Sequence, residues 1–269
     1  MRRRRSDARR VEGLSGNRRI MPFLMRGKNE SAVLFEHVVD LEHTLPWLEA
    51  RDAHLFPLLL AALARTLHDH PRLNRYVAGR RHYQRDEVSI AFAMKPRFDE
   101  RSDMSVLREV FPADETFDAL RDRLDARLAA GRKGTRSRSD READLLTRLP
   151  VPLLDAGVRL FRALDALGLA PRSMVRPDPM HASVFVANLG SLGLDAAWHH
   201  LYEYGTCPIF ATLGRIQRLP VVVDDRVEAR RAVRLRYTYD ERIEDGFYAA
   251  RALEGLRRRL EDPASWLDG

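Results

Sequence analysis

The feature that most constrains the fold is an alternating strand that runs directly into an amphipathic helix near the C-terminus. Every second side chain up to Tyr239 is apolar or aromatic, and the residues between are polar (Val233, Leu235, Tyr237 and Tyr239 against Arg234, Arg236 and Thr238). An alternation with period two is typical of a strand with one buried face. The next segment places apolar residues on one side of a helix (Ala250, Leu253, Leu256 and Leu260). We therefore expect a sheet that this helix covers.

The rest of the chain mixes the two kinds of pattern. A nearly all-apolar segment, 55–70, predicts a central buried helix that Pro71 ends. Further helices are predicted at 44–50, 116–130 and 143–169. Strands are predicted at 32–41, 183–186, 209–216 and 221–223, and a hairpin from 77–83 and 88–94. Because strands and helices follow each other without a regular βαβ alternation, the sequence predicts the α+β class.

Charge and composition bound the organisation of the chain. The formal net charge is +7, and much of the excess arginine lies in the first 19 residues and in 132–141. Residues 1–17 are therefore expected to be a flexible basic arm, 18–269 a single domain, and 131–142 a mobile loop within it. The basic segments lack a nucleic-acid motif or an aromatic stacking pattern, so no specific nucleic-acid partner is expected.

The distribution of apolar residues and the cysteine count bear on where in the cell the protein is expected. No apolar run reaches the length of a membrane-spanning helix, and no apolar stretch follows Arg2–Arg5, so neither a membrane span nor a secretory signal is expected. Cys207 is the single cysteine, which excludes an internal disulfide and a cysteine-rich metal site. We expect Cys207 to be a buried small residue, and the protein to be cytoplasmic.

The strand end itself carries a motif. Residues 239–246 read Tyr-Asp-Glu-Arg-Ile-Glu-Asp-Gly, which resembles the His-x-x-x-Asp-Gly and Asp-His-Arg-x-x-Asp-Gly motifs of the chloramphenicol acetyltransferase and dihydrolipoyl acyltransferase superfamily. Three other segments are similar to that family in order and spacing: 57–74, 185–190 (Phe-Val-Ala-Asn-Leu-Gly) and 213–224. The resemblance extends from about Leu14 to the C-terminus.

The resemblance implies an architecture and a reaction. It implies a mixed sheet flanked by helices, a trimer or a cage of trimers, and an active site in a channel between subunits. The family's motif histidine removes a proton from a thiol or hydroxyl that attacks a thioester, and a serine of the neighbouring subunit binds the oxyanion. These roles need a base with a suitable pKa and a preorganised donor.

This sequence departs from the family at both catalytic positions. Glu241 stands where the histidine is expected, and Ala187 stands where the serine is expected. A solvated glutamate has a pKa near about 4.3, and alanine donates no hydrogen bond. Asp245 matches the carboxylate that braces the active-site turn, with Arg18 or Arg19 as its expected basic partner. No tightly bound cofactor or metal is expected, and a coenzyme A or carrier thioester is the expected co-substrate.

Other residues are candidates to replace the missing groups. His199 and His200 lie in a loop that lines the channel in relatives, and either is a candidate base, oriented by Glu203 or Glu241. Asn188 is a candidate oxyanion donor, although a turn-forming role is the stronger expectation. The candidate site therefore comprises two sets: catalytic Glu241, His199, His200 and Asp245, and oxyanion- or substrate-binding Asn188, Ala187, Glu203 and Tyr239.

Two functions follow from these residues. One is an acyltransferase that moves an acyl group from a thioester to an unknown acceptor with a non-standard base. The other is a catalytically inactive relative that serves as an oligomeric scaffold or ligand-binding protein. The sequence favours the enzyme slightly.

Overall fold

A seven-stranded mixed sheet forms the centre of the protein in a computed structural model that describes residues 4–94, 105–132 and 147–268. Its strand order is β2-β10-β8-β7-β5-β6, and β9 pairs with the N-terminal half of β10. The central pairs β5–β7 and β7–β8 are parallel, whereas the other pairs are antiparallel. The strands of this sheet are β2 Ala32–Asp40, β5 Ser89–Met94, β6 Ser105–Val110, β7 Val184–Asn188, β8 Ile209–Leu213, β9 Gln217–Val223 and β10 Arg226–Asp240.

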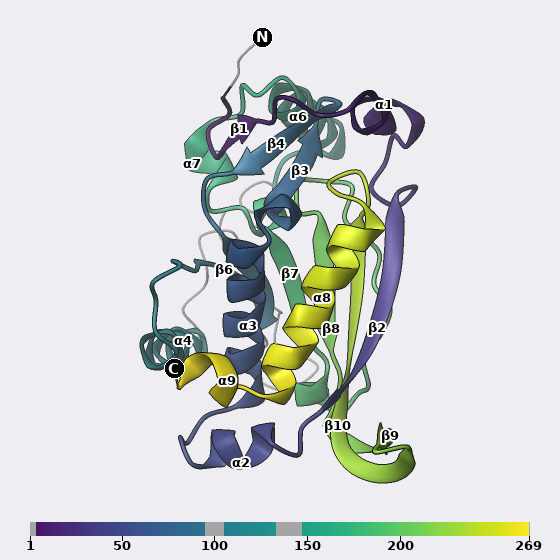
Figure 1. Cartoon of the computed structure of the whole chain (residues 1–269). Helices are drawn as coiled ribbons and strands as arrows, with labels where there is room; N and C mark the ends of the chain where they lie inside the picture. Colours follow the sequence, from purple (N-terminus) through teal and green to yellow (C-terminus); the bar gives the residue numbers. More distant parts are fainter. Residues whose placement is uncertain (1–3, 95–104, 133–146, 269) are drawn as a thin grey trace.

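A second, smaller sheet lies at one end of the molecule, and helices complete the structure (Figure 1). The order of the small sheet is β1-β4-β3, with β1 Ala8–Arg10, β3 Arg75–Ala78 and β4 Arg81–Arg85. The helices are α1 Gly16–Leu24, α2 Thr44–Glu49, α3 Leu55–Asp69, α4 Phe117–Arg132, α6 Val151–Ala166, α7 Arg172–Val175, α8 Gly246–Glu261 and α9 Ala264–Leu267. Three short 3-10 turns are η1 Pro71–Asn74, η2 Pro179–His181 and η3 Gly190–Leu192.

The predicted relation between β10 and the closing helix is confirmed. The alternating side chains of β10 that were expected to face inward are all buried, with exposed fractions of 0–3% (Val233, Leu235, Tyr237 and Tyr239). α3 and α8 lie side by side over this face, and their apolar residues join those of β10 in the main hydrophobic core (Figure 1). Burial of this apolar surface is the main stabilising contribution to such a layer.

The expected hairpin is wrong in its partner. β3 and β4 form a hairpin with each other, joined by Gly79 and Arg80, whereas β5 lies between β6 and β7 in the large sheet. Both turn residues have positive φ, 53° and 59°, as a two-residue hairpin turn that follows the strand twist requires. The segment 77–83, which was predicted to be a single strand, therefore contains the turn between β3 and β4.

The expectation of a free basic arm is wrong for residues 4–17. β1 pairs with β4, and Ser15 caps the first turn of α1. Arg5 is 5% exposed, and its guanidinium contacts Asp165 and stacks on two tyrosine rings of the small sheet. The arginine-rich composition suggested solvation, but this arginine has a specific buried carboxylate partner. The loop expected at 131–142 lies, except for the end of α4, outside the described residues.

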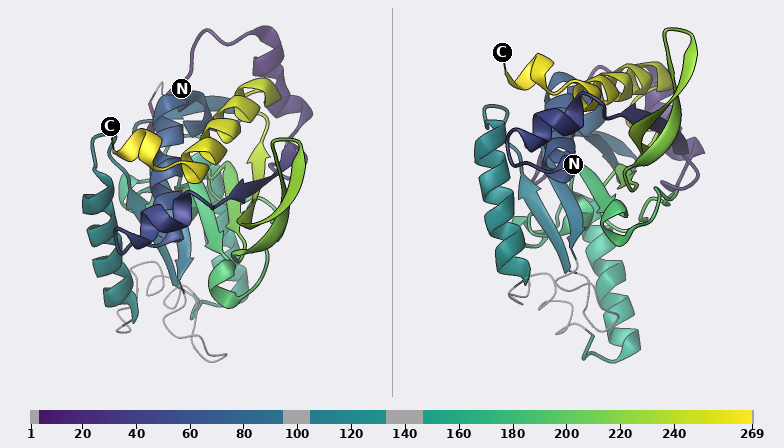
Figure 2. Two further views of the ribbon diagram at one scale, coloured as in Figure 1. Left: turned by 60° about the horizontal axis from the view of Figure 1, so that its bottom comes forward. Right: turned by 90° about the horizontal axis from the view of Figure 1, so that it is seen from below.

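Figure 2 shows the molecule from two other directions, with α6 extending beyond the sheets at one side. Along this helix Asp165 is the one buried residue, and Val151, Leu153 and Leu160 are exposed. Within the described residues, no helix is both long and apolar enough to cross a bilayer.

Candidate active site at the end of strand β10

The end of β10 and the start of α8 place the motif residues in a short, tightly bonded turn. β10 ends at Asp240, and α8 begins at Gly246. Asp245 caps the helix, because its carboxylate accepts a hydrogen bond from the backbone N–H of Tyr248 at 2.9 Å. An aspartate at this position satisfies one of the unpaired N–H groups of the first turn. Asp245 is therefore part of the motif's architecture.

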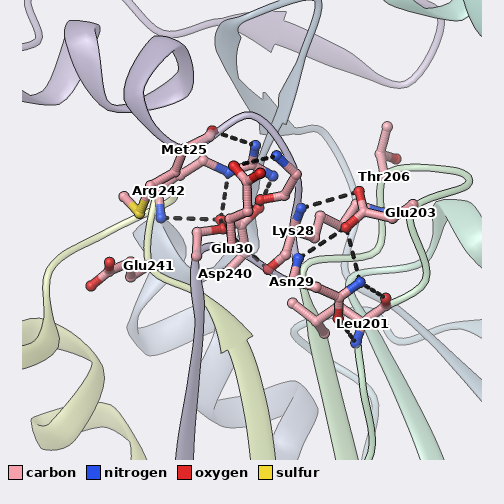
Figure 3. A network of polar contacts seen from close by, with 12 residues as sticks. Met25, Lys28, Asn29, Glu30, Leu201, Glu203, Thr206, Asp240, Glu241 and Arg242 are labelled. Carbon is pink, nitrogen blue, oxygen red and sulfur yellow. Dashed lines mark hydrogen bonds and ion pairs between the residues drawn. The ribbon is translucent and has the colours of Figure 1, made fainter.

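A buried ion pair between Asp240 and Arg242 fixes this turn (Figure 3). The Arg242 Nε and Nη2 atoms donate to the two carboxylate oxygens of Asp240 at 2.8 and 2.7 Å, and the two residues are 4% and 1% exposed. Ser31 donates a further hydrogen bond to Asp240 at 2.7 Å. The remaining guanidinium nitrogen, Nη1, donates to the carbonyl oxygens of Met25 and Arg26. This Asp240–Arg242 clamp ties the strand end to the segment that follows α1.

Glu241 has a fixed backbone and a free side chain. Its N–H donates to the Ser31 carbonyl at 2.9 Å, and its own carbonyl accepts from Arg18 Nη1 at 3.1 Å. Its carboxylate, in contrast, has no hydrogen-bond or ion-pair partner among the described residues. In Figure 3 it lies apart from the clamp and its partners. The carboxylate at the motif position is therefore free to interact with a bound molecule.

Tyr239 lies beside Glu241 on the inner side of the strand end. Its ring is 3% exposed and stacks on Phe35 at 5.8 Å, and its hydroxyl has no hydrogen-bond partner in the part of the chain that the structure describes. Burial, followed by the negative charge of Glu241, raises the pKa of Tyr239 to about 12. The hydroxyl therefore stays protonated at neutral pH and can donate a hydrogen bond.

The expected brace between Asp245 and a basic residue is replaced by Glu244. Arg18 Nη2 lies 2.8 Å from Glu244 Oε1, and Arg75 Nη1 lies 3.0 Å from Glu244 Oε2. No hydrogen bond joins Arg18 to Asp245, although the positive charge of Arg18 contributes to lowering the pKa of Asp245, after its bond from the Tyr248 N–H. Asp245 caps α8, and the neighbouring carboxylate holds the arginines.

His199 and His200 lie on the opposite side of the sheet, away from α3 and α8. The His199 ring stacks on Phe210 at 3.8 Å with an interplanar angle of 6°, and His200 stacks on His199 at 4.7 Å. The His199 carbonyl accepts from the Thr238 hydroxyl, and His199 Nδ1 lies 2.7 Å from the His200 carbonyl. Burial lowers the pKa of His199. Neither histidine contacts Glu241 or Glu203, so the orientation by these carboxylates that the sequence suggested is wrong within one subunit.

Glu203 anchors the loop that contains Lys28 and Asn29. Its carboxylate accepts from the N–H groups of Lys28 and Asn29 at 3.1 and 2.9 Å, and from the Asn29 side chain at 2.9 Å. Burial opposes ionisation, but these hydrogen bonds outweigh it and lower the pKa of Glu203. Lys28 in turn holds the segment that carries Glu203, because its ammonium donates to the carbonyls of Tyr202, Tyr204 and Gly205. Burial lowers the pKa of Lys28 to about 8.

Ala187 and Asn188 end β7, and Ala187 packs in the same apolar cluster as Phe210, the ring on which His199 stacks. Ala187 is paired with Thr212, whose hydroxyl donates to the Ala197 carbonyl at 2.6 Å and is therefore already used. Asn188 accepts from the Ser191 N–H at 3.2 Å through Oδ1, which confirms its turn-forming role. The Asn188 Nδ2 group has no partner among the described residues. Cys207 is buried, as expected, and burial raises the pKa of its thiol.

Asp240, Arg242 and Lys28 are the structural residues that the sequence analysis missed. The first two flank Glu241 in the motif and correspond to its Asp-x-Arg pattern, a signal that was present. Lys28 is one of three lysines in a chain otherwise supplied with arginine, which in retrospect singles it out. Over the described ranges 4–94, 105–132 and 147–268, no three His, Cys, Asp or Glu side chains gather as a metal site would require.

Tyr237 offers a test of unpaired buried groups near the site. It is 1% exposed, and no group within residues 4–94, 105–132 and 147–268 forms a hydrogen bond with its hydroxyl. We expect Tyr237→Phe to raise the free energy of unfolding by about 1 kcal/mol, because an unsatisfied buried hydroxyl costs roughly 1–3 kcal/mol. The control is Tyr204→Phe, which removes a hydroxyl that donates to Asp178 at 2.9 Å and should destabilise. Urea denaturation of both variants measures the effects, and a loss of stability in Tyr237→Phe would contradict the assignment.

Comparison with known proteins gives a family-model match for the C-terminal part of the chain. The model of the 2-oxoacid dehydrogenases acyltransferase (catalytic domain) matches residues 169–267, which include β7, β8, β10 and α8. No curated protein matches the chain in sequence.

Solved structures share the fold over almost the whole chain. The probable dihydrolipoamide acetyltransferase of Listeria monocytogenes is 16% identical, with a TM-score of 0.62 and coverage of 93% of this chain and 94% of that one. The cubic core of the pyruvate dehydrogenase multienzyme complex is 17% identical, with a TM-score of 0.61 and coverage of 95% and 93%. Chloramphenicol acetyltransferase is 12% identical, with a TM-score of 0.52 and coverage of 94% and 98%. At these identities the likeness establishes the fold.

Proposed function

Because this chain is a relative of the 2-oxoacid dehydrogenases acyltransferase catalytic domain with the fold of chloramphenicol acetyltransferase, we propose that it transfers an acyl group from a thioester, with Glu241 as the base. The observation that carries the proposal is the turn after β10. Its backbone is fixed on both sides of residue 241, while the carboxylate itself is unpaired among the described residues. A coenzyme A or carrier thioester is the proposed donor.

The proposed step moves one proton and one acyl group. As the acceptor's thiol or hydroxyl attacks the thioester carbonyl, its proton passes to a Glu241 carboxylate oxygen. The carbonyl oxygen becomes an oxyanion, which then expels the donor's sulfur as a thiolate. That thiolate takes the proton back from Glu241, so that the base is regenerated. Tyr239 stays protonated at neutral pH, and the charge of Glu241 contributes to this, so the two groups do not compete for the acceptor's proton.

The oxyanion needs a donor that Ala187 cannot supply. Asn188 is the proposed substitute, because its Oδ1 atom is held by the Ser191 N–H and its Nδ2 group is left free to donate. By analogy with the family, Asn188 of a neighbouring copy would face Glu241. A preorganised donor of this kind contributes roughly 3–4 kcal/mol to the transition state in other acyl transfers.

A trimer is part of the proposal. The side of the sheet that α3 and α8 leave open carries exposed apolar side chains, among them Leu34 at 52%, Trp198 at 45% and Tyr202 at 36%. Exposed apolar surface of this kind commonly marks a subunit interface. Light scattering with size-exclusion chromatography should give a mass of three chains or a multiple of it. A strict monomer at micromolar concentration would argue against a site shared between subunits.

The decisive experiment measures acyl transfer with Glu241→Gln. Amide for carboxylate keeps the shape of the side chain and removes the base, so we expect the rate to fall by about 10²-fold or more. Glu49→Gln makes the same chemical change at an exposed residue of α2 and should keep the wild-type rate. Hydrolysis or transfer from acetyl-coenzyme A is followed by release of the free thiol.

The histidine alternatives are tested in the same assay. His199→Ala and His200→Ala are expected to change the rate less than twofold, since both rings are stacked on the far side of the sheet from α8. A large loss with either histidine variant and none with Glu241→Gln would transfer the role of base to the histidines.

A non-catalytic oligomer is the second candidate, and one observation favours it. Ala187 lacks a donor, and two of the substitute groups, Glu203 and His199, are already engaged in structural contacts. Calorimetric titration with coenzyme A separates the two functions. A well-formed oligomer that neither binds nor turns over a thioester would support the scaffold.

A further inference from the structure

A basic pocket lies beside the clamp, on the side away from Glu241's carboxylate. Its volume is about 280 Å³, and five separate segments line it: α1 with the connection after it, the β3–β4 turn, the C-terminal end of α6, the loop 203–206 and the turn after β10. Five cationic side chains border it (Arg26, Lys28, Arg80, Arg162 and Arg242), against two carboxylates, Glu203 and Asp165.

The carboxylates of the pocket are already neutralised by other groups. Asp165 pairs with Arg5 and lies 3.7 Å from His181, and Glu203 accepts three hydrogen bonds from the loop 28–29. Lys28 and Arg242 are likewise fully engaged with carbonyl oxygens and Asp240.

Three arginines remain without a carboxylate. Arg26, Arg80 and Arg162 are exposed, and none has an ion-pair partner among the described residues. They come from three different parts of the sequence, so their convergence is produced by the fold. Guanidinium groups bind phosphate oxygens through paired hydrogen bonds, and an unneutralised group of three is suited to a multiply charged phosphate.

Arg80 occupies a backbone conformation that the hairpin turn requires but that an arginine rarely adopts. Its φ is 59°, at the second position of the hairpin turn, where glycine or asparagine is favoured. The preceding Gly79 packs so closely on α6 that an added Cβ would lie 2.1 Å from the Ala166 carbonyl. The turn is therefore fixed against the helix, and an arginine is kept there in a strained conformation, as functional residues often are.

A basic groove continues from the pocket on the other side of Arg80. It has a volume of about 760 Å³, and Arg10, Arg19 and Arg81 line it together with Phe23, an aromatic ring that is 51% exposed. The Arg80 guanidinium lies 5.2 Å from the centre of the Phe23 ring. The pocket is slightly below the size of common small-molecule sites, about 300–1,000 Å³, and suits a phosphate or diphosphate with the rest of the ligand in the groove.

We propose that Arg26, Arg80 and Arg162 form a binding site for the phosphate groups of an organic phosphate. This site goes beyond the acyl transfer proposed above, because it depends on charge and shape and requires no chemistry at Glu241. The same phosphate chemistry has two sources: the nucleotide end of a thioester donor, or a free nucleotide that binds on its own.

Calorimetric titration of the full chain with pyrophosphate tests the site. The variant combines Arg26→Gln, Arg80→Gly and Arg162→Gln, and the matched control combines Arg148→Gln, Arg159→Gln and Arg258→Gln, which removes the same charge from other exposed positions. We expect saturable binding to the wild type, at least tenfold weaker binding to the pocket variant, and binding within twofold to threefold of wild type in the control. No saturable binding to the wild type, or equal losses in both variants, would overturn the proposal.

The strain at Arg80 gives a second measurement that does not depend on ligand. Arg80→Gly alone is expected to raise the melting temperature while weakening pyrophosphate binding, because glycine adopts positive φ without strain. A variant that melts lower or binds as tightly as wild type would show that Arg80 serves the fold.

The two sources of phosphate are distinguished by further titrations. Tighter binding of coenzyme A than of pantetheine, with the difference lost in the pocket variant, would assign the site to the thioester donor. Binding of adenosine 3′,5′-bisphosphate that depends on the pocket, together with coenzyme A binding that does not, would assign it to a free nucleotide. Both readouts are independent of turnover, so a failure of acyl transfer leaves this test unaffected.

Discussion

Replacing Arg242 with methionine is expected to lower the free energy of unfolding by about 3–5 kcal/mol, because the substitution leaves the buried Asp240 carboxylate without its ion-pair partner. Arg242 makes two hydrogen bonds to this carboxylate, and both groups are almost completely excluded from solvent. The variant also frees the carbonyls of Met25 and Arg26, which accept from the same guanidinium. Urea denaturation at neutral pH measures the loss.

Two further variants show whether the loss comes from the isolated charge. Adding Asp240→Asn to Arg242→Met removes that charge, so the double variant is expected to be more stable than Arg242→Met alone, which is a non-additive result. The control is Arg65→Met, which breaks the exposed pair with Asp69 at 3.2 Å and should cost less than about 1 kcal/mol. Equal costs for Arg242→Met and Arg65→Met would mean that the clamp does not hold the strand end.

The sequence predicted best where one segment determines its own environment. The alternation along β10 and the apolar run of α3 specify which faces are buried, whatever their partners are. Both ends of α3 and the C-terminal end of β10 were predicted within one residue, whereas β10 begins earlier than the alternation indicated. The motif at 239–246 likewise located the strand end, because its spacing is local.

Pairing between distant segments was much less accessible. β5 has the alternation of a hairpin strand, but its neighbours are β6 and β7, which no local pattern specifies. Arginine-rich segments are similarly ambiguous: Arg5 is buried against Asp165, which lies 160 residues away in sequence. Composition predicts solvated arginines on average and cannot indicate which one has a buried partner.

The candidate site shows the same division. Glu241 was identified from the motif, yet the contacts of its neighbours were not. Glu203 was expected to orient a histidine, but it binds the loop at Lys28, 175 residues away. Arg18 was expected to pair with Asp245, but it pairs with the adjacent Glu244. A shift of one residue at a turn changes the direction of a side chain, and sequence spacing does not resolve such a shift.

A second large effect is expected from His181, which joins α6 to the body of the protein. The ring is completely buried, with Nδ1 3.0 Å from Asp178 and Nε2 3.7 Å from Asp165. Every neighbouring element contributes a group: Phe161 and Asp165 come from α6, Asp178 precedes η2, Tyr204 donates to Asp178, and Arg5 pairs with Asp165.

The balance of these groups sets the direction of the pH dependence. Burial alone would lower the pKa of His181, but its close polar contacts with Asp165 and Asp178 and the attraction of their charges outweigh burial, and the pKa rises above its ordinary value of 6.5. A histidine whose pKa is higher in the folded state stabilises fully below its unfolded pKa, and this contribution is lost as pH rises through the folded pKa. The interactions with His181 likewise outweigh burial and lower the pKa values of Asp165 and Asp178. The stability that these two carboxylates contribute is lost as the pH falls through their lowered pKa values.

We therefore expect His181→Gln to cost the most near pH 5.5, by about 3–5 kcal/mol, since the variant removes the imidazolium that lies between the carboxylates of Asp165 and Asp178. The difference from wild type should shrink as pH rises above 6.5. His200→Gln replaces an exposed histidine and is expected to keep the wild-type dependence on pH. Urea denaturation at intervals of one pH unit gives the comparison. Parallel curves for wild type and His181→Gln would show that the pKa of His181 is the same in the folded and unfolded protein, and would contradict a charged link between His181 and the two aspartates.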